Sequence, residues 1–136
     1  MENNLTSSLV GLNALICCST SGIGFSTAKE FAKLGANVTL FSRNEEKLNE
    51  CLSLLSHLNN QEHQYLVGDF NEPNDIQSII NDHIGAGNNY HILINNSPFS
   101  SSGRVFKYNT IGYKLISNFI SFSKFFFFSC FISVIN

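Results

Sequence analysis

The sequence predicts an α/β fold, in which a doubly wound parallel sheet of about four to five strands carries helices on both faces. Between residues 10 and 98, short apolar runs alternate with amphipathic segments of helical period, which is the first observation behind this prediction. The second is a glycine-rich turn between the first apolar run and the first amphipathic segment. The length of 136 residues accommodates one compact domain with its own hydrophobic core.

The first strand–helix pair extends to Gly35. The apolar run 12–18 predicts a buried strand, and the small and polar residues 19–24 predict a tight glycine turn. Helical spacing follows, with Ala28, Phe31 and Ala32 on one face and charged residues on the other. Gly35 is well placed to end this helix.

The second pair begins with a strand over residues 37–41, which a right-handed crossover joins to the first strand. Asn44 is expected to cap a helix whose first turn contains two glutamates, where the helix dipole favours acids. The apolar stripe of this helix consists of Leu48, Cys51, Leu52 and Leu55.

The third pair begins with a strand over residues 64–67. Pro73 suits the first turn of the following helix, which Gly85 and Gly87 are expected to end. The apolar stripe of this helix consists of Ile76, Ile79, Ile80 and Ile84. Residues 90–94 then predict a fourth strand.

Charge and phenylalanine are unevenly distributed along the chain. Residues 1–98 contain all ten acidic residues and four basic ones, whereas residues 99–136 contain four basic residues and no acid. Nine of the thirteen phenylalanines also follow residue 98, so we place a boundary near Pro98. With an overall net charge of −2 we expect no nucleic-acid partner.

The four cysteines lack the spacing of a zinc site or a redox motif, so we predict no metal site. Cys17 and Cys18 lie in an apolar run and are interpreted as small buried residues. This cysteine usage fits a reducing compartment, and residues 1–8 show no signal-peptide pattern. We therefore expect a cytoplasmic protein.

Gly22 and Gly24 place backbone N–H groups at the N-terminus of the first predicted helix. Such a terminus binds phosphate, because its N–H groups lack partners within the helix and the helix dipole is positive there. The glycines also leave room for the pyrophosphate of a ligand. The alternative is a simple strand-to-helix turn without a ligand.

Several segments resemble the short-chain dehydrogenase/reductase family in their order and spacing. They are residues 19–24, 31–38, 42–44, 69–70 and 94–96, so the resemblance covers roughly residues 10–98. The family carries Thr-Gly-x-x-x-Gly-Ile-Gly after its first strand, an acidic contact to adenine after its third and Asn-Asn-Ala-Gly after its fourth. The sequence looks nearest to bacterial-type 3-oxoacyl carrier-protein reductases.

The resemblance implies a Rossmann-type sheet, with residues 1–98 as an NAD(P)-binding half-domain. Arg43 follows the second strand, where NAD-dependent members carry an acid, and an arginine can pair with a ribose 2′-phosphate. The resemblance therefore implies NADP rather than NAD. Asp69 corresponds to the adenine contact, and Asn95 to a residue that braces the sheet beside the cofactor. The implied cofactor-binding residues are Ser19, Ser21, Gly22, Ile23, Gly24, Arg43, Asp69 and Asn95.

These residues also have simpler interpretations, and two positions depart from the family pattern. Arg43 could be an exposed charge at a helix start, and Asp69 could cap a turn. Cys18 stands where the family has its first glycine, which puts the pyrophosphate site in doubt. Pro98 replaces the last glycine of the family's fourth-strand motif and removes a backbone donor.

The proton-transfer pair of the family, Tyr-x-x-x-Lys, is absent. The residues four positions after the tyrosines are Asp69, Ile94, Gly112 and Ser117. We therefore predict no catalytic residue and expect the NADP(H)-binding portion of a carbonyl or alcohol oxidoreductase, truncated before its catalytic half. The alternative is a non-catalytic nucleotide-binding remnant or a mistranslated gene fragment.

Residues 99–136 form a tail rich in Phe and Ser. The tail is expected to contribute a helix near Asn109, a candidate for the family's proton relay, and a fifth strand over residues 131–135. One alternative is sequence unrelated to the family, and another is a membrane helix over residues 115–135, against which the central Lys124 argues. The incomplete pairing helices argue against a homo-oligomer of the family type.

Overall fold

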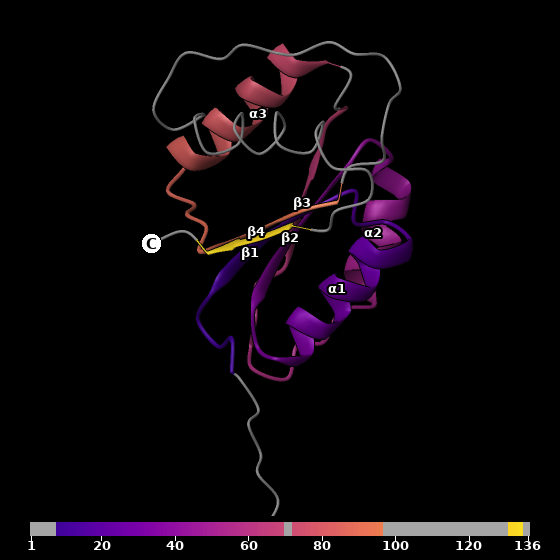
Figure 1. The fold of residues 1–136 in the computed structure, drawn as a ribbon, viewed down its shortest axis with the longest axis vertical. Helices are drawn as coiled ribbons and strands as arrows, with labels where there is room; N and C mark the ends of the chain where they lie inside the picture. The colour runs from indigo at the N-terminus through magenta and orange to yellow at the C-terminus, as the bar shows by residue number, and fades with distance from the viewer. Residues whose placement is uncertain (1–7, 70–71, 97–130, 135–136) are drawn as a thin grey trace, which may run out of the picture.

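The computed structural model describes residues 8–69, 72–96 and 131–134, and Figure 1 shows their arrangement. The predictions for Pro98, for Asn109 and for the boundary near residue 98 lie outside the described residues. So does most of the range 115–135 of the alternative membrane helix, whose described residues 131–134 form a strand instead. The elements are β1 (Asn13–Cys17), α1 (Gly22–Lys33), β2 (Asn37–Ser42), α2 (Glu45–Ser53), β3 (Gln64–Val67), α3 (Pro73–Gly85), β4 (Ile92–Asn95) and β5 (Phe131–Val134).

The strands form one sheet in the order β3-β2-β1-β4-β5. Strands β1 and β2 pair in parallel with Ala14 opposite Val38, and β1 pairs in parallel with β4 on its other side. β3 continues the parallel sheet beyond β2. The strand order reverses direction at β1, which confirms the doubly wound α/β fold of the Rossmann type.

The fifth strand differs from the rest of the sheet. β5 lies within the predicted range, but it pairs antiparallel with β4, with Phe131 opposite Asn95. An antiparallel edge strand on an otherwise parallel sheet is common, and a four-residue apolar run contains no information on its direction. The parallel sheet therefore consists of β1 to β4.

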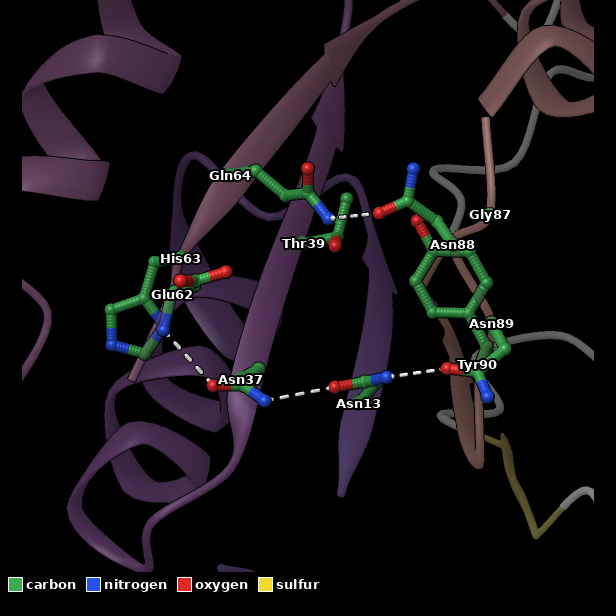
Figure 2. Close-up of a pocket in the computed structure, with 10 residues that line it drawn as sticks. All are labelled: Asn13, Asn37, Thr39, Glu62, His63, Gln64, Gly87, Asn88, Asn89 and Tyr90. Atoms are coloured by element: carbon green, nitrogen blue, oxygen red, sulfur yellow. Dashed lines mark hydrogen bonds between the residues drawn. The ribbon is translucent and has the colours of Figure 1, made fainter. Parts of the chain in front are cut away.

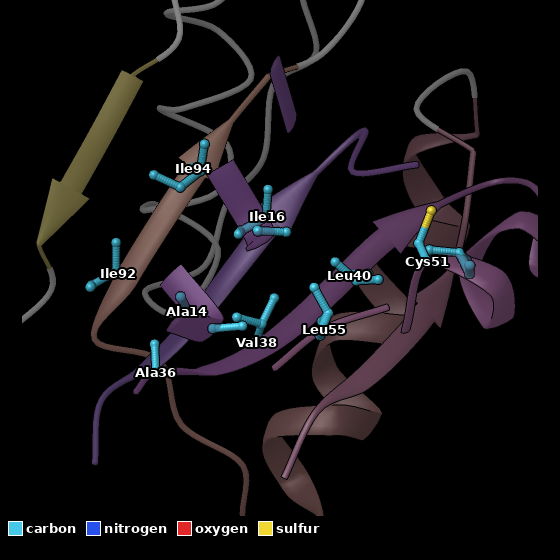
Figure 3. Packing of buried hydrophobic residues seen from close by; sticks show 12 residues of the cluster. Ala14, Ile16, Ala36, Val38, Leu40, Cys51, Leu55, Ile92 and Ile94 are labelled. Carbon is cyan, nitrogen blue, oxygen red and sulfur yellow. The ribbon is translucent and has the colours of Figure 1, made fainter. Parts of the chain in front are cut away.

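Helices α1 and α2 cover one face of the sheet, and α3 covers the other (Figure 1). The alternation along β1 decides which face each residue supplies: Ala14 and Ile16 contribute to the cluster with α1 and α2, whereas Leu15 and Cys17 contribute to the cluster with α3. Figure 3 shows the first cluster, in which Cys51 of α2 and Leu55, which follows the end of that helix, face the strand side chains.

The helix ends follow the predicted signals. The Asn44 side chain accepts a hydrogen bond from the Lys47 N–H at 3.0 Å and so caps α2, and Pro73 opens α3. α1 ends at Lys33, where the N–H of Gly35 donates to the Ala32 carbonyl at 3.1 Å. Across the described ranges, no helix combines the length and the apolar character that crossing a membrane requires.

Candidate functional site

The carboxyl ends of the four parallel strands meet at one edge of the sheet, and the predicted site residues follow these ends. The glycine turn follows β1, Arg43 follows β2, Asp69 follows β3, and Asn95 ends β4. Ligands of open α/β sheets bind outside this edge, at the point where the strand order reverses. Here that point lies between β1 and β4.

Gly24 allows α1 to lie directly against the turn. A Cβ atom at this position would lie 2.5 Å from the carbonyl oxygen of Cys18 and 2.9 Å from Nδ2 of Asn96. The buried residues of α1 are Gly24, Ala28 and Ala32, spaced four apart, so the helix presents a stripe of small residues to the sheet. Close approach of helix and strand therefore requires glycine at this position.

The N-terminus of α1 is open to solvent. Ser21, Gly22 and Ile23 are exposed, and a Cβ atom on Gly22 would meet nothing within 4 Å. Gly22 has a φ of +56°, which glycine adopts without strain. The Ser21 side chain makes no capping hydrogen bond, and the first N–H groups of a helix have no partner within it. An anion can approach these donors from solvent.

Cys18 occupies the position of the family's first glycine, and its backbone keeps a glycine-like conformation. Its φ is +53°, in the left-handed region that costs a residue with a Cβ atom about 1–2 kcal/mol. Cys18 therefore adopts a backbone conformation that glycine adopts without strain, and the chain carries the strain of its Cβ atom.

Replacing Cys18 with glycine is expected to raise the free energy of unfolding by about 0.5–1 kcal/mol, because relief of the left-handed strain exceeds the entropy cost of glycine. Cys18→Ala is the matched control, since it removes the thiol but keeps the Cβ atom. Urea unfolding measures both variants. Equal stability of the glycine and alanine variants would contradict a strained Cys18.

Ser19 and Cys51 connect the turn to neighbouring elements. Ser19 is fully buried, and its Oγ accepts a hydrogen bond from the Phe41 N–H of β2 at 3.0 Å. Cys51 of α2 directs its Sγ to the carbonyl oxygen of Thr20 at 3.5 Å. The Ser19 side chain thus points into the protein, unlike the exposed Ser21.

Arg43 and Asp69 follow adjacent strands. Arg43 is exposed, and among the described residues it forms no ion pair with a carboxylate. The Gly68 N–H donates to the Ser42 carbonyl at 3.0 Å, which places the start of the Asp69 loop beside the end of β2. Asp69 is half-buried, and its carbonyl accepts from the Glu72 N–H at 2.9 Å.

Asn96 is a site residue that sequence reasoning missed. Its amide nitrogen lies at the position that a Cβ atom on Gly24 would approach, so it borders the glycine turn. Of the Asn95–Asn96 pair, only the first asparagine was predicted to lie at the site. The signal was present, because Asn96 directly follows the carboxyl end of β4, where ligands of such sheets bind.

Two buried thiols lack the character of reactive cysteines. Burial, together with the neighbouring Cys18, raises the pKa of Cys17, and burial also raises the pKa of Cys51. Both thiols therefore stay protonated near neutral pH, whereas the thiolate is the nucleophile and metal ligand. In the described ranges, no group of three or more His, Cys, Asp or Glu side chains could hold a metal ion.

Comparison with known proteins decides the family. The model of the short chain dehydrogenase family matches residues 12–120, which is most of the chain. The chain belongs to the short chain dehydrogenase family. The match includes the glycine turn, all four parallel strands and the three helices between them.

Individual relatives are similar to this chain over shorter stretches of sequence. The very-long-chain 3-oxoacyl-CoA reductase of Anas platyrhynchos is 36% identical over 93 residues, covering 68% of this chain and 30% of the relative. A tropinone reductase homolog of Arabidopsis thaliana is 47% identical over 53 residues, covering 39% of this chain and 20% of the relative. The chain therefore spans a third or less of the length of these curated relatives.

Solved structures of short chain dehydrogenases confirm the fold. One from Escherichia coli CFT073, solved in complex with NADPH, is 27% identical with a TM-score of 0.54, covering 61% of this chain and 35% of its own. L-sorbose reductase from Gluconobacter frateurii, solved with NADPH and L-sorbose, has a TM-score of 0.62 at 22% identity. That similarity covers 84% of this chain and 46% of the reductase.

The protein also has a pocket of about 340 Å³ at the opposite edge of the sheet, where the parallel strands begin (Figure 2). Its lining is mainly polar and comprises Asn13, Asn37, Thr39, Glu62, His63, Gln64, Gly87, Asn88, Asn89 and Tyr90. Burial raises the pKa of Tyr90 to about 12, so its hydroxyl is neutral at physiological pH.

A chain of amide side chains runs along this edge. Asn37 Nδ2 donates to Asn13 Oδ1 at 2.9 Å, and Asn13 Nδ2 donates to Asn89 Oδ1 at 2.7 Å. Figure 2 shows the three side chains in line across the first residues of β2 and β1. The Glu62 N–H extends the chain by donating to Asn37 Oδ1 at 3.0 Å.

His63 lies beside these amides and requires its neutral form. Its Nδ1 accepts from the Val38 N–H at 3.0 Å, while Nε2 lies 2.7 Å from the Ser56 carbonyl, to which it can donate. Burial lowers the pKa of His63 below its usual 6.5, although the Ser56 hydrogen bond acts in the opposite direction. A proton on Nδ1 would face the Val38 N–H and abolish that hydrogen bond.

The protein is therefore expected to lose stability as the pH falls below about 6.5, because the unfolded chain then binds a proton at His63 that the folded chain excludes. Above this pH, both states hold a neutral imidazole and the contribution is constant. Urea unfolding of the wild type and of His63→Gln at pH 7.5 and 5.5 measures the effect. The variant should show a smaller loss on acidification; an equal loss would contradict this role of His63.

Proposed function

We propose that the chain binds NADP(H) at the glycine turn, as the cofactor-binding part of a short-chain oxidoreductase. The observation that carries this proposal is the geometry at the start of α1. Gly24 brings the helix against Cys18 and Asn96, while Gly22 leaves the helix N-terminus open. A pyrophosphate needs both features, since it must reach the N–H donors without meeting side chains.

The hydrogen-bond donors and the positive helix dipole at this turn suit a phosphate group. The first turn of the 12-residue helix α1 offers backbone N–H groups and the positive end of the helix dipole. The exposed hydroxyl of Ser21 adds a further donor. Ser21, Gly22, Ile23 and Gly24 are therefore proposed to hold the pyrophosphate, with Ser19 contributing to the position of the turn rather than a side-chain contact.

Arg43 supports the choice of NADP over NAD. It follows β2 directly, is exposed and has no carboxylate partner among the described residues. A free guanidinium can form two parallel hydrogen bonds to a 2′-phosphate. The Glu45 side chain, in the turn that follows, accepts a hydrogen bond from the Tyr65 hydroxyl at 3.0 Å.

Asp69 and Asn95 are proposed to complete the site at the adenine and nicotinamide ends. Asn95 ends β4, next to the point where the strand order reverses. Asp69 follows β3, which is adjacent to the strand that Arg43 follows. When bound, the cofactor supplies hydride chemistry. Because the chain contains no Tyr-x-x-x-Lys, we propose that it binds the cofactor without reducing a carbonyl by itself.

The proposal includes the cellular compartment of the protein and the type of reductase to which it is similar. Cys17 and Cys51 are buried cysteines that form no disulfide among the described residues, and this supports the reducing cytoplasm as the compartment. The relatives include a 3-oxoacyl-CoA reductase and a tropinone reductase homolog, which are reductases of different types. The similarity to 3-oxoacyl carrier-protein reductases therefore stays a prediction.

Titration of the purified chain against NADPH, followed by the fluorescence of the nicotinamide, tests the proposal. We expect saturable binding of NADPH and weaker binding of NADH. Absence of binding at millimolar NADPH would overturn the proposal. Oxidation of NADPH that depends on an added ketone or 3-oxoacyl thioester would overturn the catalytic part alone.

A further inference from the structure

Beyond the end of β1, the side chain of Ser19 accepts a hydrogen bond from the backbone of β2. The paired residues of β1 and β2 end with Cys17 opposite Phe41. The chain then turns at Cys18, and the hydroxyl of Ser19 receives the Phe41 N–H at 3.0 Å. Both residues are almost completely buried, so water cannot replace this acceptor.

We propose that Ser19 is a positioning residue that sets the preference for NADP over NAD. Its hydrogen bond joins the turn that holds the pyrophosphate to the strand end that carries Arg43. Arg43 follows Phe41 by two residues, so the Ser19 bond lies between the two phosphate-binding parts of the site. This inference rests on the proposed function.

The chemistry of the two cofactors explains why preference, rather than binding as a whole, depends on this bond. In NADPH the pyrophosphate and the 2′-phosphate are covalently linked through one ribose, so their receptors must stay at a fixed separation. NADH lacks the 2′-phosphate and does not depend on where Arg43 lies. Displacement of the β2 end relative to the turn therefore weakens NADPH binding selectively.

Other contacts maintain the fold when the Ser19 bond is lost. The end of β2 stays attached to the next strand's loop through the Gly68 N–H and the Ser42 carbonyl at 3.0 Å. The turn also contacts α2, through the long distance of 3.5 Å between Cys51 Sγ and the Thr20 carbonyl oxygen. Ser19 is thus the short polar link between the turn and β2, whereas β2 and β3 remain paired without it.

The test compares dissociation constants for NADPH and NADH in the wild type, Ser19→Ala and Ser19→Cys. We expect Ser19→Ala to lower the preference for NADPH by about threefold to tenfold, the factor that the net contribution of one hydrogen bond corresponds to. Ser19→Cys, which keeps the side-chain volume and a weaker acceptor, should give an intermediate preference. NADH affinity should stay within about twofold of the wild type.

Thr39→Val is the matched control, because Thr39 is another buried hydroxyl residue of β2 but borders the pocket at the other edge. It should leave the preference unchanged. Combining Ser19→Ala with Arg43→Ala should cause no loss of preference beyond Arg43→Ala alone, since both act on the same phosphate.

Amide hydrogen exchange provides a second measurement on the wild-type protein. NADPH should slow exchange of the Phe41 amide more than NADH does, because only NADPH engages both ends of the link. A parallel loss of both affinities in Ser19→Ala, an unchanged preference, or equal protection by the two cofactors would overturn the inference. A wild type that binds neither cofactor would instead overturn the proposed function on which it rests.

Discussion

Replacing Gly24 with alanine is expected to lower the free energy of unfolding by about 2–3 kcal/mol and to abolish most of the cofactor binding. The added Cβ atom would lie 2.5 Å from the Cys18 carbonyl oxygen, and a backbone atom cannot rotate away as a side chain can. Helix α1 must move outward, so Ala28 and Ala32 lose contact with the sheet. Urea unfolding and NADPH titration measure the two effects.

Gly85→Ala is the matched control for this change. Gly85 is also a helical glycine, but a Cβ atom there would meet nothing within 4 Å. This variant should be more stable by about 0.5–1 kcal/mol, because alanine loses less backbone entropy in a helix. If both alanine variants changed stability equally, the close approach at Gly24 would have no energetic role.

Replacing Arg43 with aspartate is expected to weaken NADPH binding by about 10- to 100-fold, with little effect on NADH. The substitution removes a charge-assisted hydrogen-bond donor, with a contribution of about 1.5–3 kcal/mol, and places a negative charge beside the 2′-phosphate. The backbone effect should be small, because Arg43 is exposed and Asn44, not Arg43, caps α2.

Lys47→Asp separates this specific pairing from a general effect of charge. Lys47 is an exposed cation in the first turn of the same helix. Its replacement changes the local charge by the same amount and should reduce NADPH affinity by less than about threefold. Equal losses in the two variants would show that the site senses only net charge, and Arg43 would not determine the cofactor preference.

The sequence was sufficient to predict the elements and their order, because each signal is local. The small stripe of α1, the Asn44 cap and Pro73 at the start of α3 depend on residues within a few positions of one another. The parallel arrangement follows from alternating strands and helices and was confirmed for β1 to β4. The direction of β5 could not be predicted, since strand pairing across the sheet leaves no periodic signal in four residues.

The site was predictable in outline but not in the orientation of its side chains. The glycine pattern located the turn, yet the spacing of Ser19 and Ser21 gives no reason to place one hydroxyl inside and the other in solvent. That difference depends on the Phe41 N–H of another strand, which donates to the Ser19 hydroxyl. Likewise, the positive φ of Cys18 follows from the turn and not from the residue type, which disfavours it.

The amide chain of Asn37, Asn13 and Asn89 has a mechanical consequence for the whole sheet. It links the first residues of β2 and β1 and the segment leading to β4 by side-chain hydrogen bonds, in addition to the backbone pairing of these strands. Among the described residues, the other edge has the Ser19 hydrogen bond to β2 and the backbone contact of Gly68. We expect the thermal fluctuations of the strands to be smaller at the edge that carries the amide chain. They should be largest at the opposite edge, where the glycine turn meets solvent.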